Sequence, residues 1–257
     1  MNFSICIDSI FGTCTNPVDS IATLKKIGFD TYEFWSWWDK DISIIERTQA
    51  DLGLSLSALC TKFISLTEKE ARDSYLKGLQ ETIEIAKQLK SKIIISQVGS
   101  ELPNIERGYQ HESIVEGLKA AAPFLEDAGL TLAIEPLNTI VDHPGYYLST
   151  ISEAAEIIEE VNSTNVKILF DIYHQQISEG NLISNIQNHI DKIAHFHAAG
   201  NPGRGTILEG EINYLAVFNA INHTNFTGAI GLEYFPMFKD AESSLVNINS
   251  FLRKNFS

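Results

Sequence analysis

The second half of the chain contains four short apolar runs that carry side chains able to bind a metal ion. Thr-Leu-Ala-Ile leads into Glu135, Val-Lys-Ile-Leu-Phe into Asp171 and Ala-Ile-Gly-Leu into Glu233, while His195-Phe-His197 lies in the run before the last. An acidic residue inside an apolar run is costly to bury without a partner. Any one of these residues could instead cap a helix or pair with an arginine, but four on consecutive runs favour a metal site.

Three carboxylates and one imidazole form an oxygen-rich ligand set with a single nitrogen. Such a set suits a hard or borderline divalent cation, Mn²⁺, Mg²⁺ or Co²⁺, more than a structural Zn²⁺. The candidate metal ligands are therefore Glu135, Asp171, His197 and Glu233, with coordination positions left for water or substrate. We assign His195 a structural role and expect it to face away from His197.

These side chains need a scaffold that brings the ends of the runs together. Eight apolar runs, rich in β-branched residues, are predicted to be strands buried on both faces. They span residues 3–10, 31–35, 55–60, 92–98, 131–135, 166–171, 193–198 and 229–233. Segments with helical spacing alternate with them, at residues 17–26, 41–51, 67–90, 111–127, 152–161, 181–189, 214–223 and 240–256.

The residues between these segments are typical of short turns that lead from a helix to the next strand. Gly28, Gly53, Gly129 and Gly228 each stand a few residues before a strand, where a helix C-cap glycine is expected. Thr67 is expected to open a capping box at the start of the longest helix.

Eight alternations of strand and helix in 257 residues predict a (β/α)8 TIM barrel, formed as one domain over residues 1–257. No GxGxxG or GxxxxGK[ST] sequence follows the first strand, which disfavours an open, doubly wound nucleotide-binding sheet. Catalytic residues of such barrels lie at the C-terminal ends of the strands. The four candidate ligands stand at those ends.

The amino-acid composition limits the binding partners and the cellular compartment that we expect for this protein. The formal net charge is −14, with 33 acidic against 19 basic residues. This balance disfavours binding of nucleic acid or an anionic membrane through bulk charge. Three cysteines without metal-type spacing suit a reducing compartment, and no apolar run reaches about 18 residues, so we expect a cytoplasmic protein without a membrane span.

An aromatic segment follows the second predicted strand. Glu33-Phe-Trp-Ser-Trp-Trp38 is expected either to wall the substrate pocket or to form a subunit interface of a homo-oligomer, with Phe34 in the core.

Several motifs in the second half resemble a known family. They are Glu135-Pro-Leu-Asn-Thr, Pro144-Gly-Tyr-Tyr-Leu, Phe170-Asp-Ile-Tyr-His-Gln-Gln, Pro202-Gly-Arg204 and Gly210-Glu-Ile-Asn-Tyr. Together they look like those of hydroxypyruvate isomerase-like proteins. These proteins belong to the xylose isomerase-like TIM-barrel superfamily, which also contains the ketose 3-epimerases.

The resemblance implies a role for each matching residue. Glu135, Asp171, His197 and Glu233 match the family's metal positions, and Glu135 and Glu233 also match its two proton-transferring carboxylates. His174 and Arg204 match positions that bind substrate oxygens. The hydroxypyruvate isomerase pattern usually has Gln in place of His197, whereas the ketose epimerases have His there.

Three classes of function follow from these features. The first is a metal-dependent isomerase or 3-epimerase that moves a proton next to the carbonyl of a small keto-acid or keto-sugar through an enediolate. The second is an endonuclease IV-like phosphodiesterase, which would need further ligands for several zinc ions and a basic groove. The third is a sugar-binding barrel without catalysis. The paired glutamates favour the first.

Overall fold

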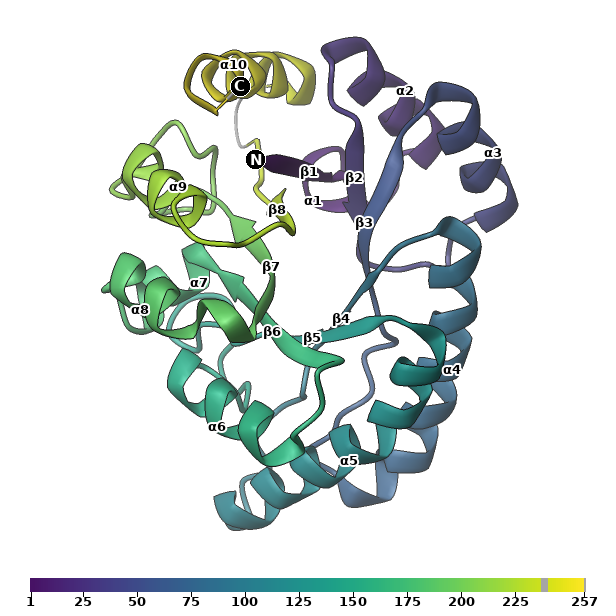
Figure 1. Ribbon diagram of the computed structural model, residues 1–257, viewed down its shortest axis with the longest axis vertical. Helices are drawn as coiled ribbons and strands as arrows, with labels where there is room; N and C mark the ends of the chain where they lie inside the picture. The colour runs from purple at the N-terminus through teal and green to yellow at the C-terminus, as the bar shows by residue number, and fades with distance from the viewer. Residues whose placement is uncertain (237–239, 257) are drawn as a thin grey trace.

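The structure, a computed structural model, describes residues 1–236 and 240–256. Eight parallel strands form a closed barrel in which β1 pairs with both β2 and β8 (Figure 1). The strands are β1 Asn2–Cys6, β2 Thr31–Phe34, β3 Ser55–Cys60, β4 Ile93–Ser96, β5 Thr131–Ile134, β6 Val166–Asp171, β7 Ile193–Ala198 and β8 Ala229–Leu232. The predicted TIM barrel is thereby confirmed.

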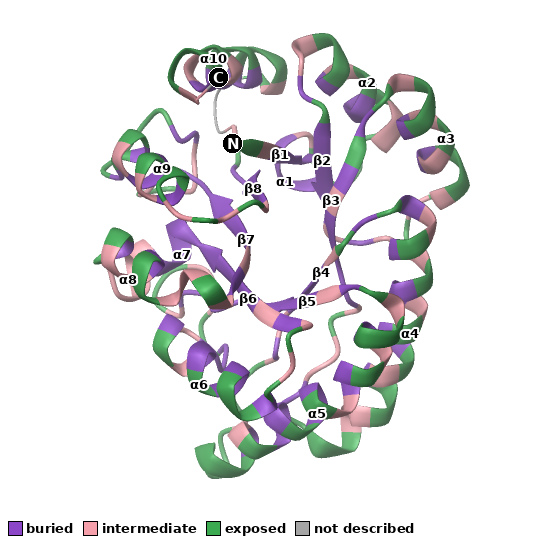
Figure 2. Ribbon diagram, viewed as in Figure 1, coloured by how far each residue is buried: buried purple, intermediate pink, exposed green. Residues whose placement is uncertain are grey.

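Helices surround this barrel (Figure 1). They are α1 Ile7–Ile10, α2 Pro17–Ile27, α3 Ile42–Leu52, α4 Arg72–Leu89, α5 Arg107–Ala128, α6 Ile151–Val161, α7 Ile172–Ser178, α8 Leu182–His189, α9 Tyr214–Asn222 and α10 Ala241–Phe256, with 3-10 turns η1 Lys69–Ala71 and η2 Ile190–Lys192. Their buried residues face the strands and their exposed residues face outward (Figure 2). Within the described part of the chain, no helix combines the length and the apolar character that a membrane span needs.

Two cores stabilise the barrel. A large cluster of aliphatic and aromatic side chains fills the space between the strands and the helices. A small cluster fills one part of the barrel interior, formed by Ala58, Cys60, Ile95, Ala133 and Leu169. Since side chains alternate along a strand, β3, β4, β5 and β6 each supply residues to both cores. This double burial is why the strands read as nearly continuous apolar runs.

The first predicted strand is too long. Residues 3–10 were expected to be one strand, but β1 ends at Cys6 and the next four residues form the short helix α1, all of them buried. The Ser9 hydroxyl donates to the Cys6 carbonyl at 3.1 Å. An apolar run indicates burial, but a short run does not separate a buried strand from a buried helical turn.

The start of the longest helix also differs from the prediction. The chain forms the 3-10 turn η1 at Lys69 before α4 begins at Arg72. The Thr67 hydroxyl donates to the carbonyl of Ser100 at 2.8 Å, so Thr67 ties two loops together and does not cap the helix. The capping-box prediction is therefore wrong, because a contact between distant loops takes the hydroxyl.

Both histidines of β7 point into the barrel. Their Nε2 atoms lie 2.9 Å (His195) and 3.0 Å (His197) from the two carboxylate oxygens of Glu33. The expectation that His195 faces away from His197 is wrong, because residues two apart on a strand point to the same face.

Three of the four predicted glycine caps are present. Gly28, Gly53 and Gly129 end α2, α3 and α5 with φ of +101°, +66° and +64°. Gly228 has no such role, since α9 ends earlier, at Asn222, with His223 as its C-cap. A positive φ strains any residue with a Cβ, so these three positions favour glycine for backbone reasons.

Gly129→Ala tests this reading of the α5 cap. A Cβ at Gly129 would meet no atom within 4 Å, so the cost comes from the backbone alone. We expect the free energy of unfolding to fall by about 1 to 2 kcal/mol, measured by urea denaturation with an unchanged m-value. The control is Gly108→Ala in the first turn of the same helix, which also has open space and has no positive φ. It should leave stability unchanged or raise it; equal losses in both variants would contradict the argument.

Candidate active site

The four candidate metal ligands converge at the C-terminal end of the barrel. Ligand atoms of Glu135, Asp171, His197 and Glu233 all lie within 4.8 Å of one another, and the four residues are buried. They follow or end β5, β6, β7 and β8, four neighbouring strands of the closed sheet. Parallel strands present their carboxyl ends at one rim, which explains how residues up to 98 positions apart in the chain meet here. That they bind a metal ion remains a prediction.

The donor set and the unpaired atoms fit a cation. His197 Nδ1 lies 3.5 Å from Glu135 Oε1 and 3.6 Å from Glu233 Oε2, and it is buried without a hydrogen-bond partner. Buried polar atoms in native proteins nearly always have a partner. Three carboxylates and one ring nitrogen that face the same small space are the ligands that a hard or borderline divalent cation takes.

Burial and mutual repulsion perturb the charges of these ligands. Burial raises the pKa of Asp171, and the neighbouring Glu233 carboxylate raises it further, against the effect of Arg204 and His197. Burial opposes the charged form of Glu233 as well, yet His197 and Arg204 lower its pKa overall. For His197, burial favours the neutral ring, but Glu233 and Glu33 outweigh it and raise the pKa well above its usual value. Negative charge is therefore in excess at this site.

Backbone hydrogen bonds hold two of the carboxylates at the ends of the strands. The Glu233 N–H donates to the Ala198 carbonyl at 3.1 Å, which continues the β7–β8 ladder by one residue. Asp171 is also the N-cap of α7, and its Oδ1 accepts from Tyr173 N at 2.7 Å and His174 N at 3.1 Å. Its second oxygen makes no hydrogen bond to a helix N–H and is left for the site.

Arg204 is held against one of the ligands. Its guanidinium forms an ion pair with Glu233 and lies between the rings of Tyr173 and Phe235, 5.5 and 5.6 Å from their centroids. The Arg204 carbonyl accepts from Phe235 N at 2.9 Å, and Arg204 has a φ of +53°. Arg204 therefore reaches the cavity predicted for the substrate, where it already neutralises one carboxylate.

His174 lies behind the site. Asn138 Nδ2 donates to its Nδ1 at 2.6 Å, and its Nε2 lies 3.6 Å from Asp171 Oδ2 without a hydrogen bond. Burial and the nearby Arg204 lower the pKa of His174 to about 3, so the ring is neutral at physiological pH. A neutral ring with Nδ1 accepting carries its proton on Nε2. His174 is fully buried, and its contact with a substrate remains a prediction.

A cavity of about 490 Å³ opens above Glu135, His197, Arg204 and Glu233. Its wall is largely apolar and is formed by Trp35, Phe63, Ile64, Leu137 and Tyr146. A largely apolar wall with a few charged and polar groups is the usual construction of a small-molecule site.

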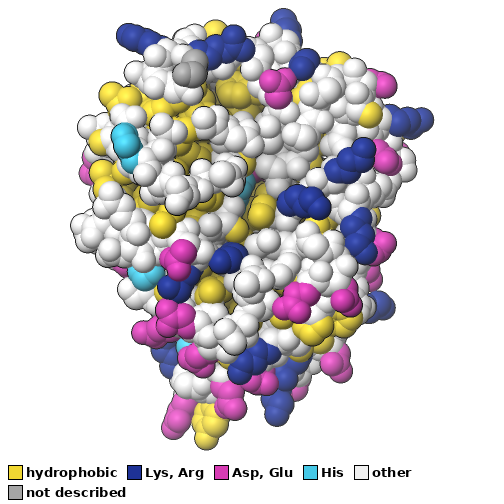
Figure 3. All heavy atoms as spheres, viewed as in Figure 1, with side chains coloured by type: hydrophobic (Ala, Val, Ile, Leu, Met, Phe, Trp, Pro, Cys, Tyr) yellow, Lys and Arg dark blue, Asp and Glu magenta, His cyan; other side chains and the backbone are white. Residues whose placement is uncertain are grey.

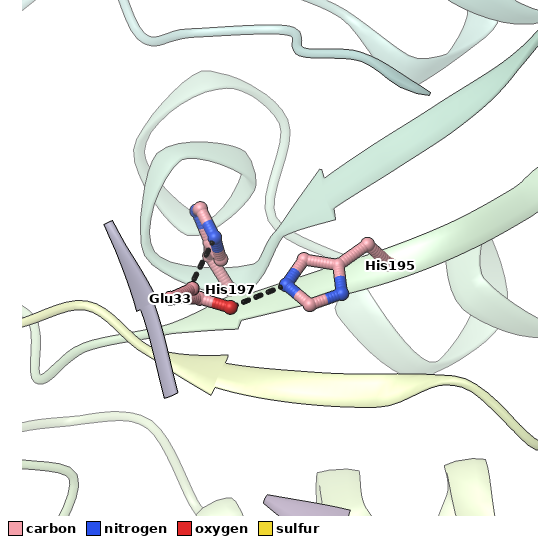
Figure 4. Close-up of side chains that lie close together, drawn as sticks. All are labelled: Glu33, His195 and His197. Atoms are coloured by element: carbon pink, nitrogen blue, oxygen red, sulfur yellow. Dashed lines mark hydrogen bonds and ion pairs between the residues drawn. The ribbon is translucent and has the colours of Figure 1, made fainter. Parts of the chain in front are cut away.

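In the aromatic segment, the expected role in the pocket wall holds for Trp35, whereas sequence reasoning missed Glu33. Trp35 lines the cavity, and its Nε1–H donates to Glu233 Oε1 at 2.5 Å, while Phe34 is buried in the core as expected. Glu33 is buried among His195 and His197 (Figure 4). The signal was present, because Glu33 is an acidic residue inside an apolar run, like the predicted ligands.

Charge on the face shown in Figure 3 is mixed. Lys and Arg side chains are scattered among Asp and Glu side chains over the described part of that face, without gathering into one broad basic area (Figure 3). The distribution is in line with the expectation that nucleic acid is not a partner, which remains a prediction.

Comparisons with known proteins show which family model and which relatives this chain matches. A family model described as "Xylose isomerase-like TIM barrel" matches residues 21–253. The chain is 33% identical to hydroxypyruvate isomerase of Escherichia coli (strain K12) over 92% of this chain and 94% of that protein. It is 37% identical to 2-oxo-tetronate isomerase of Cupriavidus necator over 51% of this chain and 50% of that protein.

A solved structure shows the same fold. The protein described as AP endonuclease, family 2, from Brucella melitensis superposes with a TM-score of 0.92 at 24% identity, covering 97% of this chain and 98% of that one. At this identity the likeness concerns the fold alone. The sequence relatives named above are isomerases, and this chain is an enzyme of the isomerase and epimerase class. From the family model and the relative that matches nearly its whole length, the chain belongs to the xylose isomerase-like TIM barrel family.

Proposed function

We propose that this protein is a metal-dependent isomerase of a small keto-acid or keto-sugar. The observation that carries the proposal is the convergence of Glu135, Asp171, His197 and Glu233, whose ligand atoms lie within 4.8 Å of one another beneath the cavity. Moving a carbonyl along a carbon chain begins with removal of a weakly acidic proton beside it. The site offers carboxylates to take that proton and ligands for a cation.

The substrate class rests on size and on the relatives. The cavity of about 490 Å³ is at the smaller end of the range for ligand sites and suits a molecule of a few carbons. The two relatives reported above are named for hydroxypyruvate and for 2-oxo-tetronate, both small keto-acids. Arg204 is the one Lys or Arg among the described residues that line the cavity, and it would face a substrate carboxylate or hydroxyl.

The chain's own groups have distinct tasks in the proposed mechanism. A divalent cation bound by the four ligands would stabilise the negative charge that develops on the substrate oxygens. Glu135 and Glu233 both approach Nδ1 of His197, at 3.5 and 3.6 Å, and would remove the proton and return it. Trp35 and Arg204 fix the two oxygens of Glu233, and Gln97 Nε2 donates to Glu135 Oε2 at 3.3 Å. The apolar wall would keep water from the reacting carbons.

Epimerisation at the third carbon of a ketose is the second candidate. His197 occupies a position that is His in the ketose 3-epimerases and usually Gln in the hydroxypyruvate isomerase pattern. Both reactions use the same groups and differ in which carbon lies between Glu135 and Glu233. We therefore expect Glu135 and Glu233 to transfer the proton in either reaction.

Replacing either proton-transferring carboxylate should abolish turnover without unfolding the protein. Glu135→Gln and Glu233→Gln keep the shape of the side chain but remove its basicity. We expect kcat to fall by about 10²-fold or more in each, with a circular dichroism spectrum like that of the wild type. The matched control is Glu156→Gln on the exposed face of α6, which should behave as wild type. Unchanged turnover in Glu135→Gln or Glu233→Gln would remove the assigned role from that residue.

Removal of the metal ion should also abolish turnover. After dialysis against a chelator, we expect activity to return with Mn²⁺, Mg²⁺ or Co²⁺ and isothermal titration to give one ion per chain. The bound ion should raise the melting temperature, and the rise should grow with the logarithm of the ion concentration above its Kd. Full activity in the chelated protein would refute metal dependence. Two or three tightly bound zinc ions per chain would instead favour the phosphodiesterase alternative.

The reacting carbon can be identified by solvent exchange. Metal-loaded protein in D₂O, given hydroxypyruvate, tetruloses and hexuloses in turn, should place deuterium on one carbon next to the carbonyl, visible by NMR. If the labelled carbon and the carbonyl carbon exchange their oxidation states, the reaction is an isomerisation. If the labelled carbon inverts its configuration, the reaction is an epimerisation. Absence of exchange across the panel would count against proton abstraction for these substrates.

A further inference from the structure

Glu33 occupies the barrel interior directly beneath the candidate metal site. It is 2% exposed, and its two oxygens face different histidines of β7 (Figure 4). Oε2 accepts a hydrogen bond from His195 Nε2 at 2.9 Å, and Oε1 lies 3.0 Å from His197 Nε2 in an ion pair that lacks the alignment of a hydrogen bond. His197 thus has Glu33 at one ring nitrogen and the ligands Glu135 and Glu233 at the other.

The sheet is locally irregular where it holds Glu33. Tyr32 pairs with Leu56 but Phe34 pairs with Leu59, so two residues of β3, Ser57 and Ala58, stand opposite Glu33. A bulge of this kind re-aims a side chain, and the Ser57 hydroxyl donates to Glu33 Oε2 at 3.0 Å. Bulges are over-represented beside active sites.

Gly231 on β8, the strand that pairs with β7, leaves room for Glu33 and His197. A Cβ on Gly231 of β8 would lie 2.1 Å from Glu33 Oε1 and 2.7 Å from His197 Cδ2. Neither approach is tolerable, so the missing side chain makes the contact between Glu33 and His197 sterically feasible. Gly231 has no positive φ, so the close approach of Glu33 and His197, and not the backbone conformation, is the reason that a glycine is needed here.

We propose that Glu33 is a positioning residue, which keeps the proton of His197 on Nε2 and so turns the lone pair of Nδ1 toward the cation. A carboxylate can only accept, so the ring nitrogen that faces it carries the hydrogen. Partners of this kind on the far side of a metal-bound imidazole fix its tautomer and orientation. The inference rests on the metal site of the proposed function, but it concerns a residue outside the four ligands.

The same three side chains allow one other reading. A ligand atom of each of Glu33, His195 and His197 lies within 4.8 Å of the others, which would also suit a second cation on the inner side of His197. The 2.9 Å hydrogen bond to His195 already accounts for one oxygen of Glu33, and the Ser57 hydroxyl is a second donor to it. Both donors face Oε2, and the ion pair with His197 Nε2 at 3.0 Å accounts for Oε1 without a second ion, so we favour the positioning role.

The affinity test compares Glu33→Gln with the wild type by isothermal titration of Mn²⁺ into metal-free protein. We expect the affinity to fall by about 10- to 100-fold while the stoichiometry stays at one. Glu156→Gln, on the surface, is the matched control and should bind as wild type. Affinity of Glu33→Gln within twofold of wild type, or two ions in the wild type and one in the variant, would overturn the proposal. Failure of the wild type to bind any ion would refute the proposed function itself.

A second measurement uses the wild type alone, in case Glu33→Gln does not fold. Long-range ¹H–¹⁵N NMR of protein loaded with Zn²⁺, a diamagnetic probe, reports which nitrogen of His197 keeps its proton. We expect a protonated Nε2 and a metal-bound Nδ1, the arrangement in which the proton lies on the nitrogen that faces Glu33. A protonated Nδ1, or a His197 ring unaffected by Zn²⁺, would overturn the proposal.

Discussion

The architecture of this protein depends on the burial of negative charge at the mouth of the barrel. Glu135, Asp171 and Glu233 are each at most 4% exposed, and Glu33 lies beneath them. Ionised carboxylates are stable in such surroundings only when cations and hydrogen-bond donors compensate them. Arg204 supplies one positive charge, and the remaining excess is what a divalent cation would balance.

The side chains inside the barrel form an apolar group on one side and a polar group on the other. Ala58, Cys60, Ile95, Ala133 and Leu169 form an apolar cluster on one side. On the other side, Glu33 of β2 and the two histidines of β7 are polar inward residues, and Gly231 of β8 carries no side chain. The apolar side provides rigid packing, while the polar side holds Glu33, His195 and His197 in fixed contact. A catalytic group that must not move more than a fraction of an ångström benefits from such support.

Within this frame each side chain of the site has a separate structural reason for its position. Asp171 is fixed because it caps α7, and Glu233 is fixed by Trp35 and Arg204. Glu135 is held through its own backbone as well, since the Tyr146 hydroxyl donates to its carbonyl at 3.1 Å. In the proposed mechanism the carboxylates would therefore not have to reorganise when charge develops on a bound substrate, which is the condition for electrostatic catalysis.

The sequence by itself determined the alternation of strands and helices and which candidate ligands stand at the strand ends. Both follow from local patterns, since apolar runs and capping residues act over a few positions and parallel strands share one rim. Only the tertiary structure decided the partners: Arg204 on Glu233, and Glu33 on a histidine 162 residues away. It also decided that Ile7–Ile10 is helical and that His195 faces inward. The physical reason is that closure of the barrel brings β2 and β7 across the interior, where register shifts and a missing Cβ at Gly231 determine which buried groups meet.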